Sequence, residues 1–291
     1  MKPASFAYHA PHTLDEALRL VAELEDARLL AGGQSLVPML NLRLAMPAHV
    51  IDLGRIASLA GIEETDQRVV IGAMTTQRQI EKSPLIARRC PLLHEAIAQV
   101  GHQQTRNRGT IGGSLCHLDP AAELPVVAAA LEATLEATSI EGTRRIAFRD
   151  FPVGYLQSQL RRDEILTRVE FPALEARTGW AFVEFARREG DFAITSVAAL
   201  VTCDADGKIA RARIAAGGLG PRPMRVVDTE ERLAGRAWSA TLADVAGELV
   251  AAQPAEGDAL YPADYRRHLA GVLARRALAQ AVARARNPAH A

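Results

Sequence analysis

The segment Thr110-Ile111-Gly112-Gly113-Ser114-Leu115-Cys116-His117-Leu118-Asp119-Pro120 is the most informative part of this chain. Its glycine pair is followed by a small polar residue, and a similar arrangement occurs earlier in Ala31-Gly32-Gly33-Gln34-Ser35. Each pair follows a short run that can form a strand. A glycine pair lets backbone N–H groups approach a ligand closely, and consecutive N–H groups form a nest that binds anions. Two nests suit a ligand with two phosphates, although both pairs can also be simple tight turns.

The sequence around the two pairs predicts alternating helices and strands. Thr13 and Glu16 form a capping-box pattern in front of apolar residues at helical spacing. Residues 50–53 and 69–73 are expected to be strands, and 92–100 a helix. A polar loop is expected at 101–109, leading into the second pair. Further strands are predicted at 131–138, 143–148 and 164–171, which together indicate a mixed α+β domain.

Beyond residue 175 the pattern changes to a small sheet backed by helices. Strands are expected at 181–187, 195–202 and 209–215, with a hairpin turn at Asp204-Ala205-Asp206-Gly207. Residues 229–233 look helical, and an Ala, Arg and Leu pattern predicts a long helix at 265–286. The length of 291 residues also favours two domains over one compact core.

Composition excludes several classes of function. Lys plus Arg and Asp plus Glu both total 34, so the net charge is zero, and neither nucleic acid nor a membrane surface is the expected partner. Cys90, Cys116 and Cys203 are far apart, so we expect no iron–sulfur cluster, zinc site or other metal site in this chain. Scattered thiols and the lack of an apolar leader or transmembrane segment favour a cytoplasmic protein.

The two glycine segments, with Asp119-Pro120-Ala121-Ala122-Glu123-Leu124-Pro125 behind the second, resemble the FAD-binding (medium) subunit of molybdenum hydroxylases. This family includes bacterial carbon monoxide dehydrogenase and the flavin domain of xanthine dehydrogenase. The resemblance continues, in the order of the family, at residues 164–172, 185–193 and 217–223. It covers nearly the whole chain, and its strength comes from the order of the four matches.

The resemblance implies an α+β fold, with a two-subdomain FAD-binding domain of the vanillyl-alcohol oxidase and xanthine dehydrogenase type and a small α+β C-terminal domain. The expected limits are 1–175 for the first domain, with subdomains 1–55 and 56–175, and 176–291 for the second. FAD is expected to bind without a covalent link. The expected FAD-binding residues are Ala31, Gly32, Gly33, Gln34, Ser35, Thr110, Ile111, Gly112, Gly113, Ser114, His117, Asp119, Glu123, Leu166 and Phe192.

Several of these residues have a second interpretation. Asp119 and Glu123 are expected beside the ribityl and isoalloxazine part of the flavin, but carboxylates also favour a helix start. His117 is expected near the flavin without acting as a catalytic base, and is otherwise a packing residue. Phe192 is either a shield over the isoalloxazine ring or a core residue of the second domain. The family often has Asn at Ser114, so this contact is expected to be lost or water-mediated.

The expected function is electron transfer within a larger enzyme. The resemblance implies a molybdopterin-binding large subunit, a small subunit with two [2Fe-2S] clusters, and this chain as the FAD carrier, assembled as a dimer of heterotrimers. The FAD would take electrons from the nearer cluster and pass them to an external acceptor, and no catalytic residue is expected here. The basic pairs Arg106/Arg108 and Arg187/Arg188 are either solvated or part of a partner interface. The alternatives are a self-contained FAD oxidoreductase and a flavin-free scaffold subunit.

Overall fold

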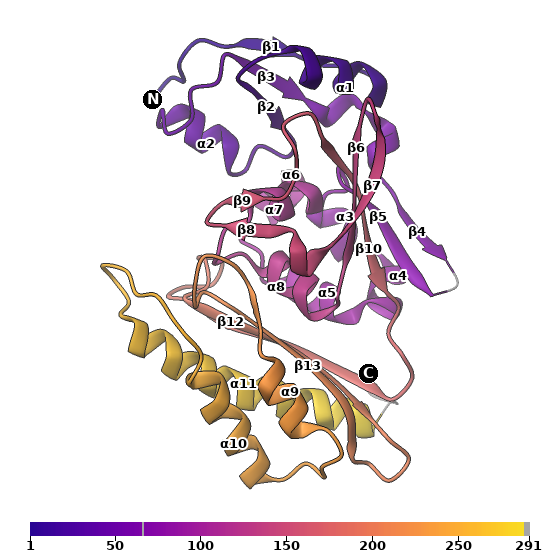
Figure 1. Cartoon of the computed structure of the whole chain (residues 1–291), viewed down its shortest axis with the longest axis vertical. Coiled ribbons are helices and arrows are strands. Elements are labelled where there is room, and N and C mark those ends of the chain that lie inside the picture. The colour runs from indigo at the N-terminus through magenta and orange to yellow at the C-terminus, as the bar shows by residue number, and fades with distance from the viewer. Residues whose placement is uncertain (66, 288–291) are drawn as a thin grey trace.

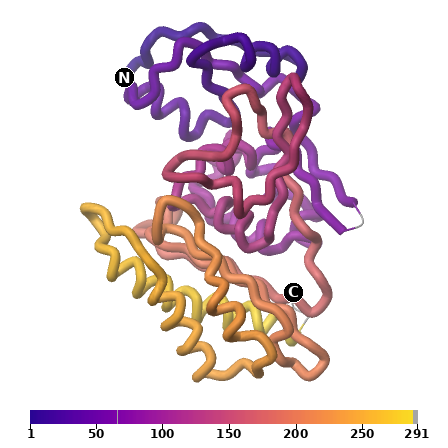
Figure 2. Tube along the Cα trace, in the orientation of Figure 1, coloured from indigo at the N-terminus to yellow at the C-terminus, as the bar shows by residue number. Residues whose placement is uncertain are grey.

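The computed structural model describes residues 1–65 and 67–287, which form three regions stacked along the long axis (Figure 1). Figure 2 shows that these regions largely follow one another along the chain. The N-terminal subdomain contains a parallel sheet in the order β1-β3-β2. Helix α1 begins at the predicted capping box of Thr13 and Glu16. The elements are β1 (Ala7–His9), α1 (Leu14–Glu23), β2 (Ala27–Leu30), α2 (Leu36–Asn41), β3 (His49–Asp52) and the 3-10 turns Leu53–Arg55 and Ala57–Leu59.

The middle subdomain is an antiparallel sheet, in the order β4-β5-β10-β6-β7, packed against helices. Alternate residues of its strands, such as Val69 and Ile71, join the helices in one buried core. Its strands are β4 (Ile62–Thr65), β5 (Arg68–Gly72), β6 (Thr134–Ser139), β7 (Gly142–Ala147), β10 (Ile165–Pro172) and the hairpin β8 (Pro152–Gly154) and β9 (Gln157–Ser158). Its helices are α3 (Gln77–Glu81), α4 (Pro84–Arg89), α5 (Pro91–Ile97), α6 (Gln103–Arg108), α7 (Ile111–His117), α8 (Glu123–Ala130) and the 3-10 turn Phe148–Asp150.

The C-terminal domain is an antiparallel sheet buried on both faces. Trp180, Phe182 and Leu200 pack into the core of the middle subdomain, whereas Ala181 and Val197 pack against the C-terminal helices. The elements are β11 (Thr178–Phe185), β12 (Thr195–Cys203), β13 (Ile209–Gly217), β14 (Met224–Arg225), α9 (Val227–Leu233), α10 (Ala240–Ala251) and α11 (Ala263–Arg286). No helix in the described ranges is both long enough and apolar enough to cross a membrane.

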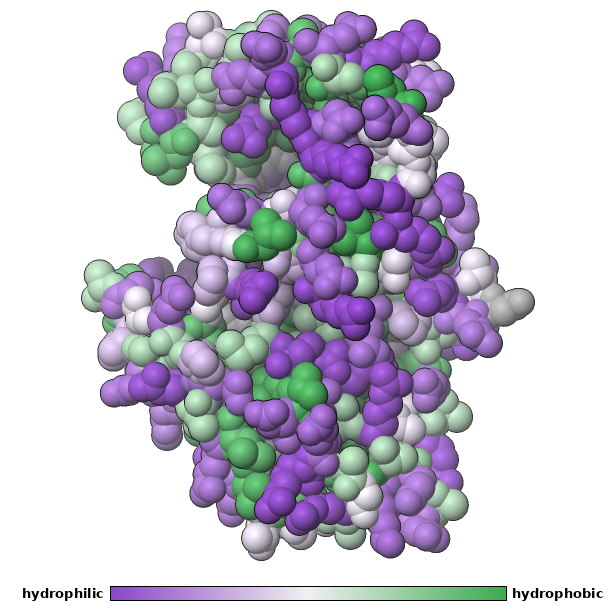
Figure 3. Space-filling view, in the orientation of Figure 1, coloured by the Kyte–Doolittle hydropathy of each residue, from purple (hydrophilic) through white to green (hydrophobic). Residues whose placement is uncertain are grey.

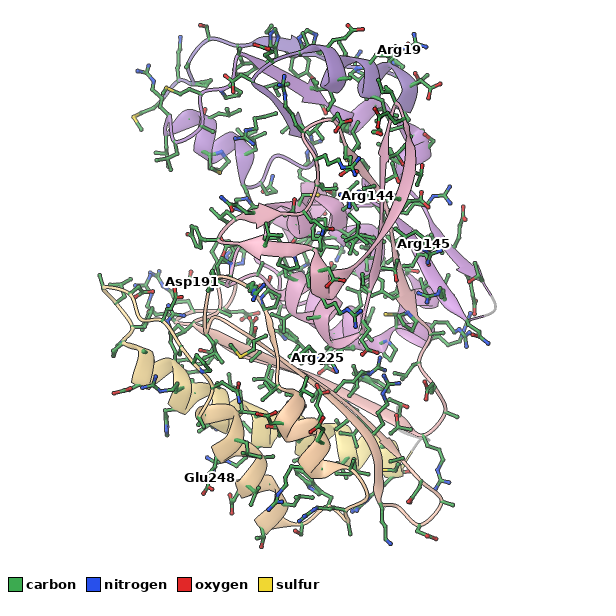
Figure 4. The ribbon with its side chains drawn as sticks, in the orientation of Figure 1. Arg19, Arg144, Arg145, Asp191, Arg225 and Glu248 are labelled. Carbon is green, nitrogen blue, oxygen red and sulfur yellow. The ribbon has the colours of Figure 1, made fainter. Side chains whose placement is uncertain are left out.

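An arginine cluster also joins the C-terminal domain to the middle subdomain. Glu132, just after α8, accepts hydrogen bonds from Arg211, Arg213 and Arg225 at 2.9–3.2 Å. Arg225 also binds Glu230 with two hydrogen bonds of 2.7 Å and lies between the two domains in Figure 4. These charge-assisted bonds and the shared apolar core fix the C-terminal sheet under the middle subdomain.

Two local predictions around the second glycine pair are wrong. Residues 103–108 form helix α6 rather than a polar loop, because Arg106 binds Glu81 and two backbone carbonyls and so holds this polar segment in place. Gly112 and Gly113 lie in the first turn of helix α7 and do not follow a strand, because the Thr110 side chain caps that helix. The strand predicted from residue 131 begins at Thr134, since the preceding residues end helix α8.

Candidate functional site

The structure brings the two glycine segments into direct contact. We name residues 31–35 the first loop and residues 108–114 the second loop. A Cβ atom on Gly32 would lie 2.1 Å from the carbonyl oxygen of Arg108, and one on Gly113 would lie 3.3 Å from the Cβ of Ala31. Both distances require the two backbones to lie side by side. The glycines are therefore needed for the contact between the N-terminal and middle subdomains.

The first loop presents unused hydrogen-bond donors. It follows β2, and Gly33 has a φ of +76°, a conformation that glycine adopts without strain. Within residues 1–65 and 67–287, the backbone N–H groups of Gly32, Gly33 and Gln34 have no acceptor. The exposed Gln34 side chain makes only a long contact of 3.5 Å with the Gly32 carbonyl. Such consecutive free amides are suited to bind an anion.

The second loop lacks the nest that its sequence predicts. The Gly112 N–H donates to the Ala73 carbonyl at 2.8 Å, and the Gly113 N–H donates to Thr110 Oγ1 at 3.0 Å. The Ser114 N–H donates to the Thr110 carbonyl. This part of the prediction is wrong, because the helix cap and the packing on Ala73 already satisfy these amides. Position 112 instead requires glycine because the packing on Ala73 leaves no room for a side chain: a Cβ there would lie 2.6 Å from the Ala73 Cβ.

A cavity of about 250 Å³ opens beside the first loop. Its walls are formed by the first loop itself, the end of β2, helix α2, Asp52 at the end of β3, and Arg108. The molecular surface is notched between the N-terminal lobe and the middle of the molecule (Figure 3). Asp52 and Arg108 were not among the predicted site residues. Two signals could have identified these residues. Asp52 ends a parallel strand, and Arg108 stands just before the second glycine pair.

The stretch after the second loop carries three of the predicted residues. His117 ends helix α7 and is half-buried. Asp119 Oδ1 accepts a hydrogen bond from the Ala121 N–H at 2.9 Å, so one of its oxygens supports the turn into α8. Glu123 is the first residue of α8 and is only 3% exposed. Glu123 therefore begins a helix, as one of its two interpretations expected. Its side chain is nevertheless more buried than a carboxylate at a helix start needs to be.

Glu123 forms an acidic pair with the half-buried Glu184, which the sequence analysis did not identify. Burial raises the pKa of Glu123 to about 7, with a further contribution from the charge of Asp119. Burial also raises the pKa of Glu184 on β11 to about 8, and the charge of Glu123 adds to this shift. One Glu184 oxygen is buried without a hydrogen-bond partner. Near neutral pH, these carboxyls therefore retain protons that exposed carboxyls have lost.

The last two predicted residues occupy different environments. Leu166 lies in β10 beside a register shift and is 4% exposed. Phe192 is 63% exposed, so its interpretation as a core residue of the second domain is wrong. Its loop lies close to the start of α6: Gly190 has a φ of +82°, and a Cβ there would lie 2.4 Å from the His102 ring. Figure 4 shows the neighbouring Asp191 near the boundary between the two domains.

The basic pairs divide into different roles. Arg106 is mostly buried and binds both oxygens of Glu81 and the carbonyls of Val100 and Gly101. Its interpretation as a solvated or partner-docking residue is therefore wrong. Arg187 and Arg188 are exposed and lie 3.6 and 3.7 Å from Asp191. Exposed ion pairs of this kind contribute little to stability. Both interpretations of Arg187 and Arg188, as solvated residues or as part of a partner interface, are therefore compatible with the structure.

Comparison with protein families identifies the chain. Residues 4–174 match the model of the FAD binding domain in molybdopterin dehydrogenase. The chain belongs to this family. Residues 180–281 match the CO dehydrogenase flavoprotein C-terminal domain, so both halves agree. FAD is thus the cofactor of this chain, and molybdopterin and iron–sulfur clusters belong to other subunits of such complexes.

Individual relatives match over nearly their entire length. The chain is 41% identical to the 6-hydroxypseudooxynicotine dehydrogenase complex subunit alpha of Paenarthrobacter nicotinovorans, over 98% of this chain and 97% of that one. It is 38% identical to the carbon monoxide dehydrogenase medium chain of Hydrogenophaga pseudoflava, over 98% and 99%. A solved structure of that dehydrogenase, lacking the Mo-pyranopterin moiety of its cofactor, gives a TM-score of 0.94 at 39% identity and covers 98% of this chain and 99% of that one. The predicted fold and family are confirmed.

The contact between the two loops predicts the effect of Gly32→Ala. The added methyl group would overlap the Arg108 carbonyl, so the loops must separate. We expect a loss of about 1–3 kcal/mol in the free energy of unfolding and a clear loss of bound FAD, measured by thermal unfolding and by flavin absorbance. Gly220→Ala is the matched control, because a Cβ there meets no atom within 4 Å. Equal flavin content in both variants would contradict the assignment.

The acidic pair predicts how stability depends on pH. A carboxyl whose pKa is raised on folding stabilises the folded state below its unfolded pKa, and this contribution is lost as pH rises through the folded pKa. For Glu184 this stability is lost between the ordinary carboxyl pKa of 4.5 and the folded-state pKa of about 8. Glu184→Gln, a neutral isostere, should therefore gain thermal stability relative to the original chain as pH rises through this window. Glu189→Gln, an exposed carboxyl on the next loop, is the control. The prediction fails if the difference between Glu184→Gln and the original chain does not change with pH.

Proposed function

We propose that this chain is the FAD-carrying electron-transfer subunit of a heterotrimeric molybdenum hydroxylase. The observation that carries the proposal is the contact between the two glycine loops beside a cavity with free amide donors. FAD supplies one- and two-electron transfer, and the protein supplies its binding, orientation and electrostatic environment. The chain would receive electrons from a [2Fe-2S] subunit and pass them to an external acceptor.

The residues of the site fit FAD. The free N–H groups of the first loop are suited to the diphosphate. The second loop would contribute the Thr110 and Ser114 hydroxyls and the close approach of Gly113 and Ile111, while Ala31 and Ser35 complete the first loop. His117, Asp119, Glu123 and the backbone of Leu166 would line the ribityl and isoalloxazine part. The exposed Phe192 would cover the ring, which the closeness of Gly190 to His102 supports.

The proposed assembly is a dimer of heterotrimers, each with a molybdopterin-binding large subunit and a small subunit with two [2Fe-2S] clusters. The names of the relatives support a subunit, since they include medium chains and a subunit alpha. We propose residues 1–175 as the FAD domain and 176–291 as the C-terminal domain, which the separate sheets support. A cytoplasmic location is supported by the three free cysteines.

The proposal predicts how the bound flavin responds to reductants. In anaerobic absorption measurements, photoreduction should bleach the flavin of the isolated chain. Carbon monoxide, nicotine, caffeine and glyceraldehyde, chosen from the names of relatives, should leave it unchanged. The reduced [2Fe-2S] subunit purified from the same complex should bleach it. Acid precipitation should release the flavin into the supernatant, because it is not covalently bound.

Two outcomes would contradict this function. Bleaching of the isolated chain by one of the four compounds would favour the self-contained oxidoreductase. Absence of flavin after purification and after addition of FAD would favour the scaffold subunit. In the complex, purification through this chain should also recover a molybdenum-containing and an iron–sulfur subunit, which elemental analysis can identify.

A further inference from the structure

We propose that the guanidinium group of Arg108 binds the diphosphate of FAD and supplies the positive charge of this subsite. The inference rests on the proposed function and adds Arg108, which was not among the site residues predicted from the sequence. Arg108 lines the cavity together with Gly32, Gly33 and Gln34, the residues of the first loop with free amides. A guanidinium can bind phosphate oxygens through two parallel hydrogen bonds.

The Arg108 side chain is available for a ligand. Within the described ranges of the chain it makes no hydrogen bond and no ion pair. Arg106, two residues earlier on the same helix, is the opposite case, because Glu81 and two carbonyls use its donors. Arg108 is exposed at the edge of the cavity. Of the two arginines at the end of α6, only Arg108 therefore has donors to offer to an incoming anion.

The carboxylate of Asp52 favours a cation in this cavity. Asp52 also lines the cavity, and its negative charge would repel a diphosphate. Its oxygens already accept hydrogen bonds from the Tyr8 hydroxyl at 2.5 Å and from the Gly54 N–H at 2.8 Å. Neither of these donors carries a positive charge. Arg108 lines the same cavity and offsets the charge of Asp52 when a diphosphate is bound.

The second loop cannot supply this charge through its backbone. The amides of Gly112 and Gly113 donate to Ala73 and Thr110, so they do not form an anion nest. The first loop contributes partial charges from its free amides on one side of the cavity. Arg108, whose backbone lies against Gly32, contributes a full charge to the same cavity. The subsite thus combines neutral donors from one subdomain with one cation from the other.

Equilibrium binding of FAD to the flavin-free full-length chain tests the proposal. We compare the original chain with Arg108→Ala, Arg108→Lys and Arg28→Ala, where Arg28 is an exposed arginine of β2 that is not part of the cavity wall. Flavin fluorescence reports the dissociation constants for FAD and for riboflavin, which lacks the diphosphate. ADP, which keeps the diphosphate, is measured as a competitor. Thermal unfolding confirms that each variant is folded.

We expect Arg108→Ala to weaken FAD and ADP binding by about 10- to 100-fold, as loss of charged hydrogen bonds predicts. Riboflavin binding and the unfolding midpoint should not change, and Arg108→Lys should retain part of the affinity. The effect on FAD should shrink at high salt, because the interaction is between charges. Arg28→Ala should behave as the original chain.

Two results would overturn the proposal. One is unchanged FAD affinity in Arg108→Ala, which would leave Arg108 as a surface residue or a contact for a partner subunit. The other is an equal loss for FAD and riboflavin, which would indicate a general disturbance of the site. Failure of the original chain to bind FAD would instead contradict the proposed function itself, so the two failures are distinguishable.

Discussion

The contact between the backbone of Gly32 and the carbonyl of Arg108 is the constraint on which the site depends. There is no space for a Cβ at this point, because it would lie only 2.1 Å from that carbonyl oxygen. The contact joins a parallel-sheet subdomain to an antiparallel-sheet subdomain, two units with separate sheets. A cavity at such a boundary can receive groups from both sides. Free amides come from one side, and Arg108 comes from the other.

The C-terminal domain packs against the middle subdomain, which carries the second loop. Its sheet is buried on both faces, so it cannot move without exposing apolar surface. Gly190, whose φ of +82° favours glycine, brings the Phe192 loop close to His102, the residue before α6, the helix that ends at Arg108. Burial raises the pKa of Glu123 to about 7 and that of Glu184 to about 8 near this boundary. The segments that carry the expected FAD contacts are thus connected through packed helices and strands.

The sequence predicted the family and the fold class, because these depend on short motifs in a fixed order. It could not predict which amides remain free. The nest expected at Gly112 and Gly113 is absent because Ala73, distant in sequence, accepts one of their hydrogen bonds. Arg106 and Arg108 look equivalent in sequence, but the tertiary position of Glu81 makes the first structural and leaves the second available. The pairing of Glu123 with Glu184 likewise arises only from domain packing.

Hydrogen–deuterium exchange with and without FAD tests the central claim most directly, because it reports which backbone amides gain protection. The account predicts strong FAD-dependent protection at Gly32, Gly33 and Gln34, whose amides are free without the ligand. It predicts much smaller changes at Gly112 and Gly113, whose amides are already bonded. Protection confined to the second loop, or the absence of a change in the first, would contradict the assignment of the diphosphate to this cavity.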